Sequence, residues 1–78
     1  MYGYWLIDNA NRFRIPAENF TDAVNYGLWF WNRILTQSQR EKRFDFFVCS
    51  GRSEHDDPND LDVTTIDCKF DIKGYCGI

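Results

Sequence analysis

The sequence predicts one small α+β domain, in which a single amphipathic helix covers a four-stranded antiparallel sheet. Two short strand-like segments come first, a long segment with helical periodicity follows, and two more strand-like segments complete the chain. The 78 residues suffice for one domain, spanning residues 1–78. So short a chain buries only about 60% of its unfolded surface, and we expect its 14 aromatic residues to supply much of the core. The order of elements is therefore ββαββ, with two layers around one core.

The first two strands form a predicted hairpin. Residues 4–8, Tyr-Trp-Leu-Ile-Asp, predict the first strand, and the charged and apolar residues that alternate over residues 12–15 predict the second. Between them, residues 8–11 are typical of a turn, because Asp and Asn side chains cap their own backbone and tolerate left-handed conformation. Pro16 ends the second strand.

A helix is expected from about residue 20 to about residue 38. Asn19 suits its N-cap, and Asp22 lies near the positive end of the helix dipole. One side of the helix is apolar and is expected to face the core. That side comprises Phe20, Ala23, Val24, Gly27, Phe30, Trp31, Ile34 and Leu35. The glycine near its middle indicates a close approach of the helix backbone to the sheet.

Two further strands, at residues 44–50 and 63–73, are predicted to flank an acidic surface loop at about residues 52–62. We expect one face of the sheet to contact the helix and the other to meet solvent or a partner. The residues expected to point to the helix are Trp5, Ile7, Phe13, Ile15, Phe44, Phe46 and Val48. Those expected to point away are Tyr4, Leu6, Arg12, Arg14, Phe47 and Lys69, together with the acidic residues Asp8, Asp45, Asp67 and Asp71.

Side chains suited to catalysis or metal binding are few and badly spaced. The only histidine, His55, lies in the acidic loop, where nothing would hold it against Cys49. The candidate zinc ligands Cys49, His55, Cys68 and Cys76 lack the close pairs of a zinc site, and Cys68 is expected on the apolar side of its strand. The acidic loop lacks the central glycine of an EF-hand, and no glycine-rich phosphate loop occurs. We therefore expect a protein that is not an enzyme, with no catalytic residue, metal or cofactor; a small enzyme or metal protein around Cys49 and His55 is the weakest alternative.

Three cysteines without a disulfide spacing suggest reduced thiols, as in the cytoplasm. No signal peptide and no membrane-spanning segment are evident, so we expect a cytoplasmic protein without a membrane partner. The net charge of −3 divides into +2 over residues 1–43 and −5 over residues 44–78. Because nucleic-acid binders usually carry a basic excess, direct nucleic-acid binding is not the leading expectation.

Three surfaces are candidates for binding. Trp29 lies opposite the apolar side of the helix, among Asn25, Asn32 and Arg33, while Tyr26 flanks the apolar side. Trp, Tyr and Arg dominate interface hot spots; the alternative is that the helix end or the long loop covers Trp29. The exposed sheet face would offer Tyr4, Phe47, Arg12 and Arg14 for stacking on bases, unless its charges only form cross-strand pairs. The acidic loop offers Glu54, Asp56, Asp57, Asp60 and Asp62, which either mimic phosphates or only keep the loop soluble.

The opening Tyr-Trp-Leu-Ile-Asp, the Arg-Phe-Arg-Ile-Pro-Ala that follows, and the helix start Asn-Phe-Thr-Asp-Ala-Val resemble small proteins of phages and mobile elements. Several type I anti-CRISPR inhibitors share this ββαββ plan. The resemblance concerns architecture and includes no shared motif, so it carries no site residues over. It implies a non-enzymatic inhibitor that acts in the host cytoplasm by stoichiometric docking on a host protein or complex, with a nucleic-acid-binding defence complex as one candidate.

Two other binding modes stay open at this point. A small module for RNA or single-stranded DNA would use the exposed sheet face. An unpaired edge strand would allow homodimerisation by strand addition.

Overall fold

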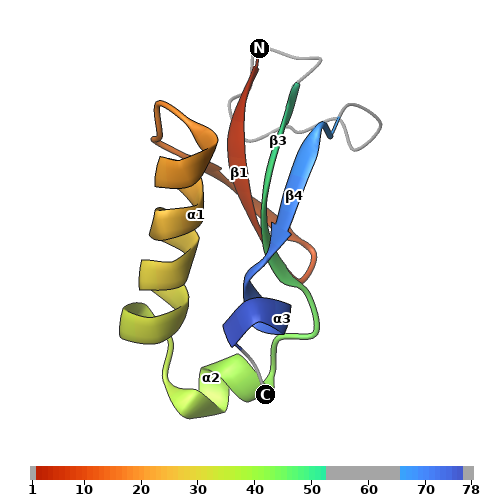
Figure 1. Cartoon of the computed structure of the whole chain (residues 1–78). Coiled ribbons are helices and arrows are strands. Elements are labelled where there is room, and N and C mark those ends of the chain that lie inside the picture. Colours follow the sequence, from red (N-terminus) through yellow and green to blue (C-terminus); the bar gives the residue numbers. More distant parts are fainter. Residues whose placement is uncertain (1, 53–65, 77–78) are drawn as a thin grey trace.

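A four-stranded antiparallel sheet carries one long helix on one face, as Figure 1 shows. The computed structural model describes residues 2–52 and 66–76. The strands are β1 (Tyr2–Asp8), β2 (Asn11–Ile15), β3 (Phe46–Arg52) and β4 (Cys68–Asp71), and their order in the sheet is β2-β1-β3-β4. The helices are α1 (Phe20–Trp29), the π-helix η1 (Phe30–Ile34), α2 (Gln37–Glu41) and α3 (Ile72–Cys76). The predicted α+β fold is confirmed.

The predicted hairpin of β1 and β2 is also confirmed, with Tyr4 opposite Ile15 and Leu6 opposite Phe13. Asn9 occupies the turn with a φ of 54°, which is the left-handed region that Asn tolerates better than most residues. Its side-chain oxygen accepts hydrogen bonds from the backbone N–H groups of Phe44, at 2.9 Å, and Asp45, at 3.2 Å. The turn is thereby joined to the segment that leads into β3.

The long helix ends earlier than expected, because a second helix begins at residue 37. Leu35 is extended, with φ −77° and ψ 133°, and Thr36 caps α2. Thr36 Oγ1 accepts a bond from the backbone N–H of Gln39, and Gln39 Oε1 accepts one from the backbone N–H of Thr36. This reciprocal capping box is readable in the sequence as Thr-x-x-Gln, and it competes with continuation of the first helix.

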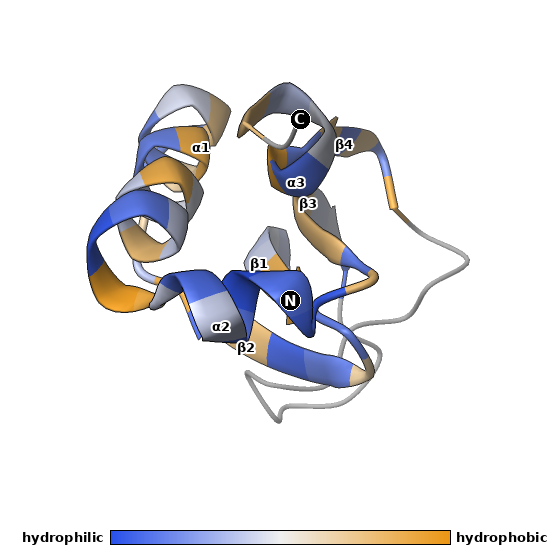
Figure 2. Ribbon diagram, turned by 90° about the horizontal axis from the view of Figure 1, so that it is seen from below, coloured by the Kyte–Doolittle hydropathy of each residue, from blue (hydrophilic) through white to orange (hydrophobic). Residues whose placement is uncertain are grey.

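The last turn of the long helix is a π-helix rather than an α-helix. The N–H of Leu35 donates to the carbonyl of Phe30, five residues earlier, at 3.1 Å. This wider turn takes in one extra residue and changes which side chains face the core. Ile34, expected on the core side, is consequently 48% exposed, so that expectation was wrong. Figure 2 shows this end of η1 in orange, next to α2.

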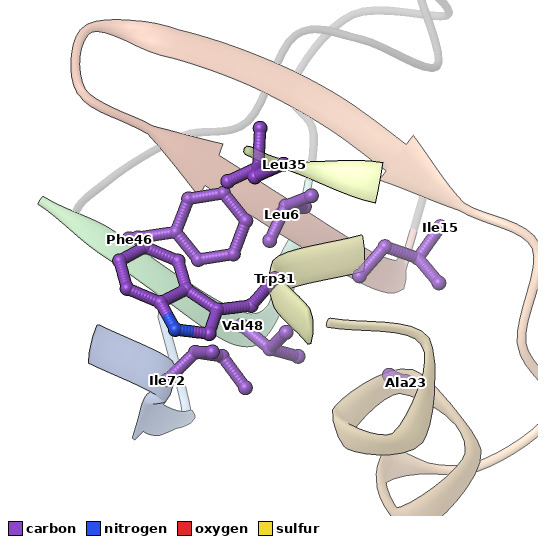
Figure 3. Packing of buried hydrophobic residues seen from close by; sticks show 8 residues of the cluster. All are labelled: Leu6, Ile15, Ala23, Trp31, Leu35, Phe46, Val48 and Ile72. Carbon is purple, nitrogen blue, oxygen red and sulfur yellow. The ribbon is translucent and has the colours of Figure 1, made fainter. Parts of the chain in front are cut away.

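The main core lies between the helix and the sheet. In Figure 3 the ring of Trp31 from η1 packs beside Phe46 from β3, with ring centres 5.0 Å apart. The buried residues of this cluster are Leu6, Ile15, Ala23, Trp31, Leu35, Phe46, Val48 and Ile72. A Cβ on Gly27 would lie 2.6 Å from Cγ2 of Val48, which confirms the predicted close approach of the helix to the sheet.

The two faces of β1 were assigned the wrong way round. Leu6 belongs to the cluster under the helix, with Tyr4 packed against it, whereas Trp5 and Ile7 lie on the opposite face. In β1, the residues that point to one face and those that point to the other are both apolar. The alternation of polar and apolar residues that normally identifies the buried face is therefore missing here. Phe44, also expected under the helix, precedes β3 and is exposed.

The sheet face away from α1 is not open along β1 and β3. Trp5, Ile7 and Cys49 form a second buried cluster, with Phe47 and Ile66 packed against it. Trp5 is 0% exposed. The central strand β1 is therefore buried on both faces, whereas the sequence predicted that one face of the sheet is exposed.

The C-terminal segment differs from the long strand predicted over residues 63–73. Within the described part of the chain the strand covers only Cys68–Asp71, and α3 follows at once. Asp71 Oδ1 accepts a hydrogen bond from the backbone N–H of Gly74 at 3.0 Å, which starts the helical turn. This turn brings Ile72 into the main core. The N-terminal part of the predicted strand, residues 63–65, lies outside the described residues.

Candidate functional site

The outer side of the long helix carries an exposed aromatic and aliphatic surface. Trp29, the last residue of α1, is 48% exposed. Of the two alternatives that the sequence left open, an exposed anchor or a tryptophan covered by the helix end or the long loop, the structure supports the first. Tyr26 lies one turn earlier and is half-buried, Arg33 lies one turn later and is exposed, and Ile34 reaches the surface because of the π-helix. These four residues, Tyr26, Trp29, Arg33 and Ile34, are called the Trp29 surface below.

Ring contacts connect this surface to the core. The ring centre of Trp29 lies 5.6 Å from that of Tyr26 and 6.3 Å from that of Phe30. Phe30 in turn stacks on the buried Phe46 at 6.0 Å. An exposed tryptophan held by neighbouring rings loses little conformational entropy on binding, so the arrangement is preorganised for contact with another molecule.

The π-helix next to Trp29 has its own polar support. The Nδ2 of Asn32, in the π-helix, donates to the carbonyl of Leu28 in α1 at 2.9 Å. π-Turns inside helices are rare and occur frequently at functional sites. Nothing in the helical periodicity of the sequence indicates this turn, and an α-helical wheel therefore places Ile34 on the core side.

Charges of opposite sign lie at the two ends of this helix side. Arg33 is exposed, and among the described residues its side chain makes no hydrogen bond or ion pair. Asp22 is exposed in the first turn, where its Oδ2 accepts a bond from Asn19 Nδ2 at 3.3 Å. A partner that contacts the Trp29 surface therefore meets a cation at the C-terminal end and an anion toward the N-terminal end.

The sheet residues proposed for base stacking are arranged differently from expectation. Tyr4 lies on the helix side, with its ring centre 6.3 Å from that of Phe20. On the far side, the guanidinium carbon of Arg14 lies 4.9 Å from the centre of the Trp5 ring, and Lys69 Nζ lies 4.1 Å from that of Phe47. Cations thus occupy positions over the rings that a nucleobase would need.

Arg12 and Arg14 do lie on the sheet face away from α1, as predicted, since they pair in register with Ile7 and Trp5. Arg14 also donates from Nη2 to the carbonyl of Tyr2 at 3.3 Å. Asp8, expected on this face, lies on the other one, where Arg43 Nε approaches its Oδ1 at 3.0 Å.

The predicted acidic-loop site lies outside the described residues, as does His55. The residues of that site are Glu54, Asp56, Asp57, Asp60 and Asp62.

A groove of about 750 Å³ opens between α2 and α3. Trp31 and the charged residues Arg40, Glu41, Asp71 and Lys73 are among the residues that line it. Both cations are already engaged: Arg40 Nη1 donates to the carbonyl of Trp31 at 3.1 Å, and Lys73 Nζ donates to that of Arg43. Among the described residues that line the groove, acids and bases are equal in number, two of each. Neither wall of the groove was foreseen from the sequence, because both short helices were missed.

The three cysteines are free thiols in three different environments. Cys49 is buried in the second cluster, and its burial raises the pKa of its thiol from 9.0 to about 11, although Lys69 and Arg12 lower that pKa in part. Cys68 is exposed, against the expectation of a position on the apolar side of its strand, and Cys76 is half-buried.

We expect a thiol-specific reagent to label Cys68 and Cys76 well before Cys49. At a pH below 9, the raised pKa lowers the thiolate fraction of Cys49 about a hundredfold relative to an ordinary thiol. Burial slows the labelling of Cys49 further, because the reagent has to reach the buried sulfur. The labelling rate followed by mass spectrometry checks this. In a Cys49→Ala variant, only the slowest phase of the labelling reaction should disappear. A folded protein in which all three thiols react at the same rate would contradict the prediction.

The described ranges, residues 2–52 and 66–76, hold no group of three side chains that would bind a metal ion. None of the helices in these ranges combines the length and apolar character needed to cross a bilayer.

Comparisons with known proteins found no matching family model, no curated protein of similar sequence and no solved structure of similar fold. The class of the molecule is accordingly defined by its own fold, a small α+β domain with an exposed aromatic surface on its long helix.

Proposed function

We propose that this chain is a non-enzymatic protein-binding domain that docks on a partner through the Trp29 surface. The observation that supports the proposal is a half-exposed tryptophan, held by ring contacts to the core, beside an exposed isoleucine and an arginine without a side-chain partner among the described residues. Trp, Tyr and Arg contribute most of the binding energy at protein interfaces. Exposing such a group serves no purpose for the stability of the isolated domain.

The chemistry of the surface specifies the partner. An apolar recess would take up the indole ring of Trp29 and the side chain of Ile34, and a carboxylate would pair with the guanidinium of Arg33. Burial of one indole ring removes roughly 150–250 Å² from water, enough to anchor a small interface. The partner is therefore a protein with an acidic rim around an apolar pocket.

The specific form that we propose is an inhibitor encoded by a phage or mobile element, which blocks a host defence complex in the cytoplasm by occupying it stoichiometrically. The support for this form is the architectural resemblance to type I anti-CRISPR inhibitors. A domain that acts by occupancy needs a rigid surface and no catalytic residues.

Binding of RNA or single-stranded DNA is the competing function. The net charge of −3 opposes it, since binding to phosphates depends on a basic excess. The positions of Arg14 and Lys69 over the rings of Trp5 and Phe47 oppose it as well. A protein partner fits these observations better.

Replacing Trp29 with alanine is expected to weaken capture of the partner by at least 2 kcal/mol, about thirtyfold, while the domain stays folded. The measurement is affinity capture from host lysate with quantitative mass spectrometry, followed by titration of the captured protein. Tyr75→Ala is the matched control, because Tyr75 is an aromatic residue that is 70% exposed on α3, outside the Trp29 surface. Equal capture by both variants would rule out the Trp29 surface, and capture that vanishes after nuclease treatment would favour the nucleic-acid alternative.

The inhibitory form has a separate test. The chain is expressed in bacteria with an active type I CRISPR system and challenged with a targeted phage. We expect plaque formation to recover with the natural sequence and with Tyr75→Ala, but not with Trp29→Ala. Plaque counts that stay low with the natural sequence would refute anti-CRISPR activity against that system and leave the binding result unaffected.

A further inference from the structure

The outward side of the long helix has a spacing that suits pairing with a second helix. Asp22, Tyr26, Trp29 and Arg33 follow one another at intervals of four, three and four residues. This alternation is that of the contact positions in a coiled coil. Within α1 this spacing places the first three residues on one stripe. The exposed side chains of Arg33 and Ile34 follow in η1, directly after Trp29.

The stripe is complementary to itself when it is reversed. If two copies of the helix lie antiparallel about a point between Tyr26 and Trp29, Trp29 of each copy faces Tyr26 of the other. The same alignment brings Arg33 of each copy opposite Asp22 of the other. A two-fold axis requires such self-complementarity, because each residue of the stripe must suit the one that it meets.

We propose that the chain associates with a second copy of itself through this antiparallel helix pairing. Charge complementarity supports a second copy as the occupant: two ion pairs, Arg33 with Asp22 and their symmetry mates, flank two aromatic contacts. Arg33 has no side-chain partner among the described residues of its own chain, and only one oxygen of the Asp22 carboxylate is engaged, by Asn19. In a parallel pair, equal charges would meet instead and repel each other.

The other route to a dimer, strand addition at the edge strand β2, is less favourable. In an antiparallel pair of β2 strands centred on Phe13, Arg12 of one copy would lie opposite Arg14 of the other. Like charges opposite each other on neighbouring strands are destabilising. The helix surface therefore suits self-association better than the sheet edge.

One helix pair buries less area than a standard interface, so the dimer is weak and reversible. It covers the Trp29 surface, and for this reason self-association and docking on another protein exclude each other. This regulatory consequence rests on the proposed function, whereas the dimer itself does not. The dimer would protect the exposed tryptophan until a partner with higher affinity displaces the second copy.

Sedimentation equilibrium of the purified chain over a wide concentration range tests the proposal. The natural sequence is expected to shift from monomer to dimer as the concentration rises. Asp22→Arg and Arg33→Glu should each raise the dimer dissociation constant at least about tenfold, since each puts like charges together. An equimolar mixture of the two variants should dimerise again, because both stripe arginines of the Asp22→Arg chain then meet the two stripe carboxylates of the Arg33→Glu chain.

Asp45→Arg is the control for the charge change itself, because Asp45 is exposed in the segment before β3 and lies off the stripe. It should dimerise like the natural sequence. Circular dichroism of every variant verifies folding, and recovery in the mixture shows that both single variants retain a competent helix.

A chain that stays monomeric at all concentrations, or variants whose mixture fails to dimerise, would overturn the proposal. A dimer that both charge variants leave intact and Phe13→Asp abolishes would place the contact at β2 instead and would also overturn it. All these measurements use the purified chain alone, so their failure is distinct from a failure of partner capture.

Discussion

Alanine in place of Trp5 is expected to lower the free energy of unfolding by about 3–5 kcal/mol. The side chain is 0% exposed and packs with Ile7 and Cys49, so its removal leaves a large cavity in the smaller cluster. The Arg14 guanidinium would also lose the aromatic ring that it covers. A domain of this size has a total stability of roughly 4–12 kcal/mol, so this one substitution removes a large share of it.

Trp29→Ala is the matched control, since it deletes the same ring from the opposite side of the molecule. Trp29 is 48% exposed, and we expect a loss of less than about 1 kcal/mol. Urea titration followed by circular dichroism measures both variants. If Trp5→Ala cost no more than Trp29→Ala, the face of the sheet away from α1 would be an exposed surface after all, and base stacking there would regain support.

The Asn9→Ala variant is expected to lose about 2–3 kcal/mol of stability, the second largest effect. Alanine in left-handed conformation costs roughly 1–2 kcal/mol, and Asn9 has a φ of 54°. The substitution also removes the oxygen that accepts hydrogen bonds from the N–H groups of Phe44 and Asp45. Each bond contributes about 1 kcal/mol, less where water replaces the lost partner.

Asn9→Gly separates the two contributions, because glycine tolerates a positive φ but lacks the side-chain bonds. We expect it to be more stable than Asn9→Ala by about 1 kcal/mol and less stable than the natural sequence. Thermal unfolding of the three proteins shows the order directly. An alanine variant as stable as the glycine variant would mean that the backbone conformation at this turn carries no cost.

The local signals in the sequence identified most of the elements. Turn residues and alternation located the first hairpin, and Asn19 started the helix where expected, with its side chain accepting a bond from the N–H of Asp22 at 2.9 Å. Helical periodicity placed Trp29 opposite the core side, since α1 is regular up to that residue, but only the structure showed that no other segment among the described residues covers it fully. Each of these features depends on residues that are close together in the chain.

The features that the sequence left undecided depend on contacts between distant segments. Both sides of β1 are apolar, so only its pairing with β3 and the position of α1 decide that Leu6 faces the helix and Trp5 faces away. The helix breaks at Leu35 because Leu35 packs into the core while Thr36 caps a new helix. Ile34 is pushed to the surface by the same π-turn, which completes the candidate binding surface.

Short-range chemistry therefore accounts for the first hairpin, the start of the helix and the position of Trp29 opposite the core side. The faces of the sheet, the end of the helix and the neighbours of that tryptophan arose from packing between elements. The reason is that a sequence pattern shows which side of a helix or strand is buried only where the other side is polar. The most buried described strands, such as β1, carry apolar residues on both sides.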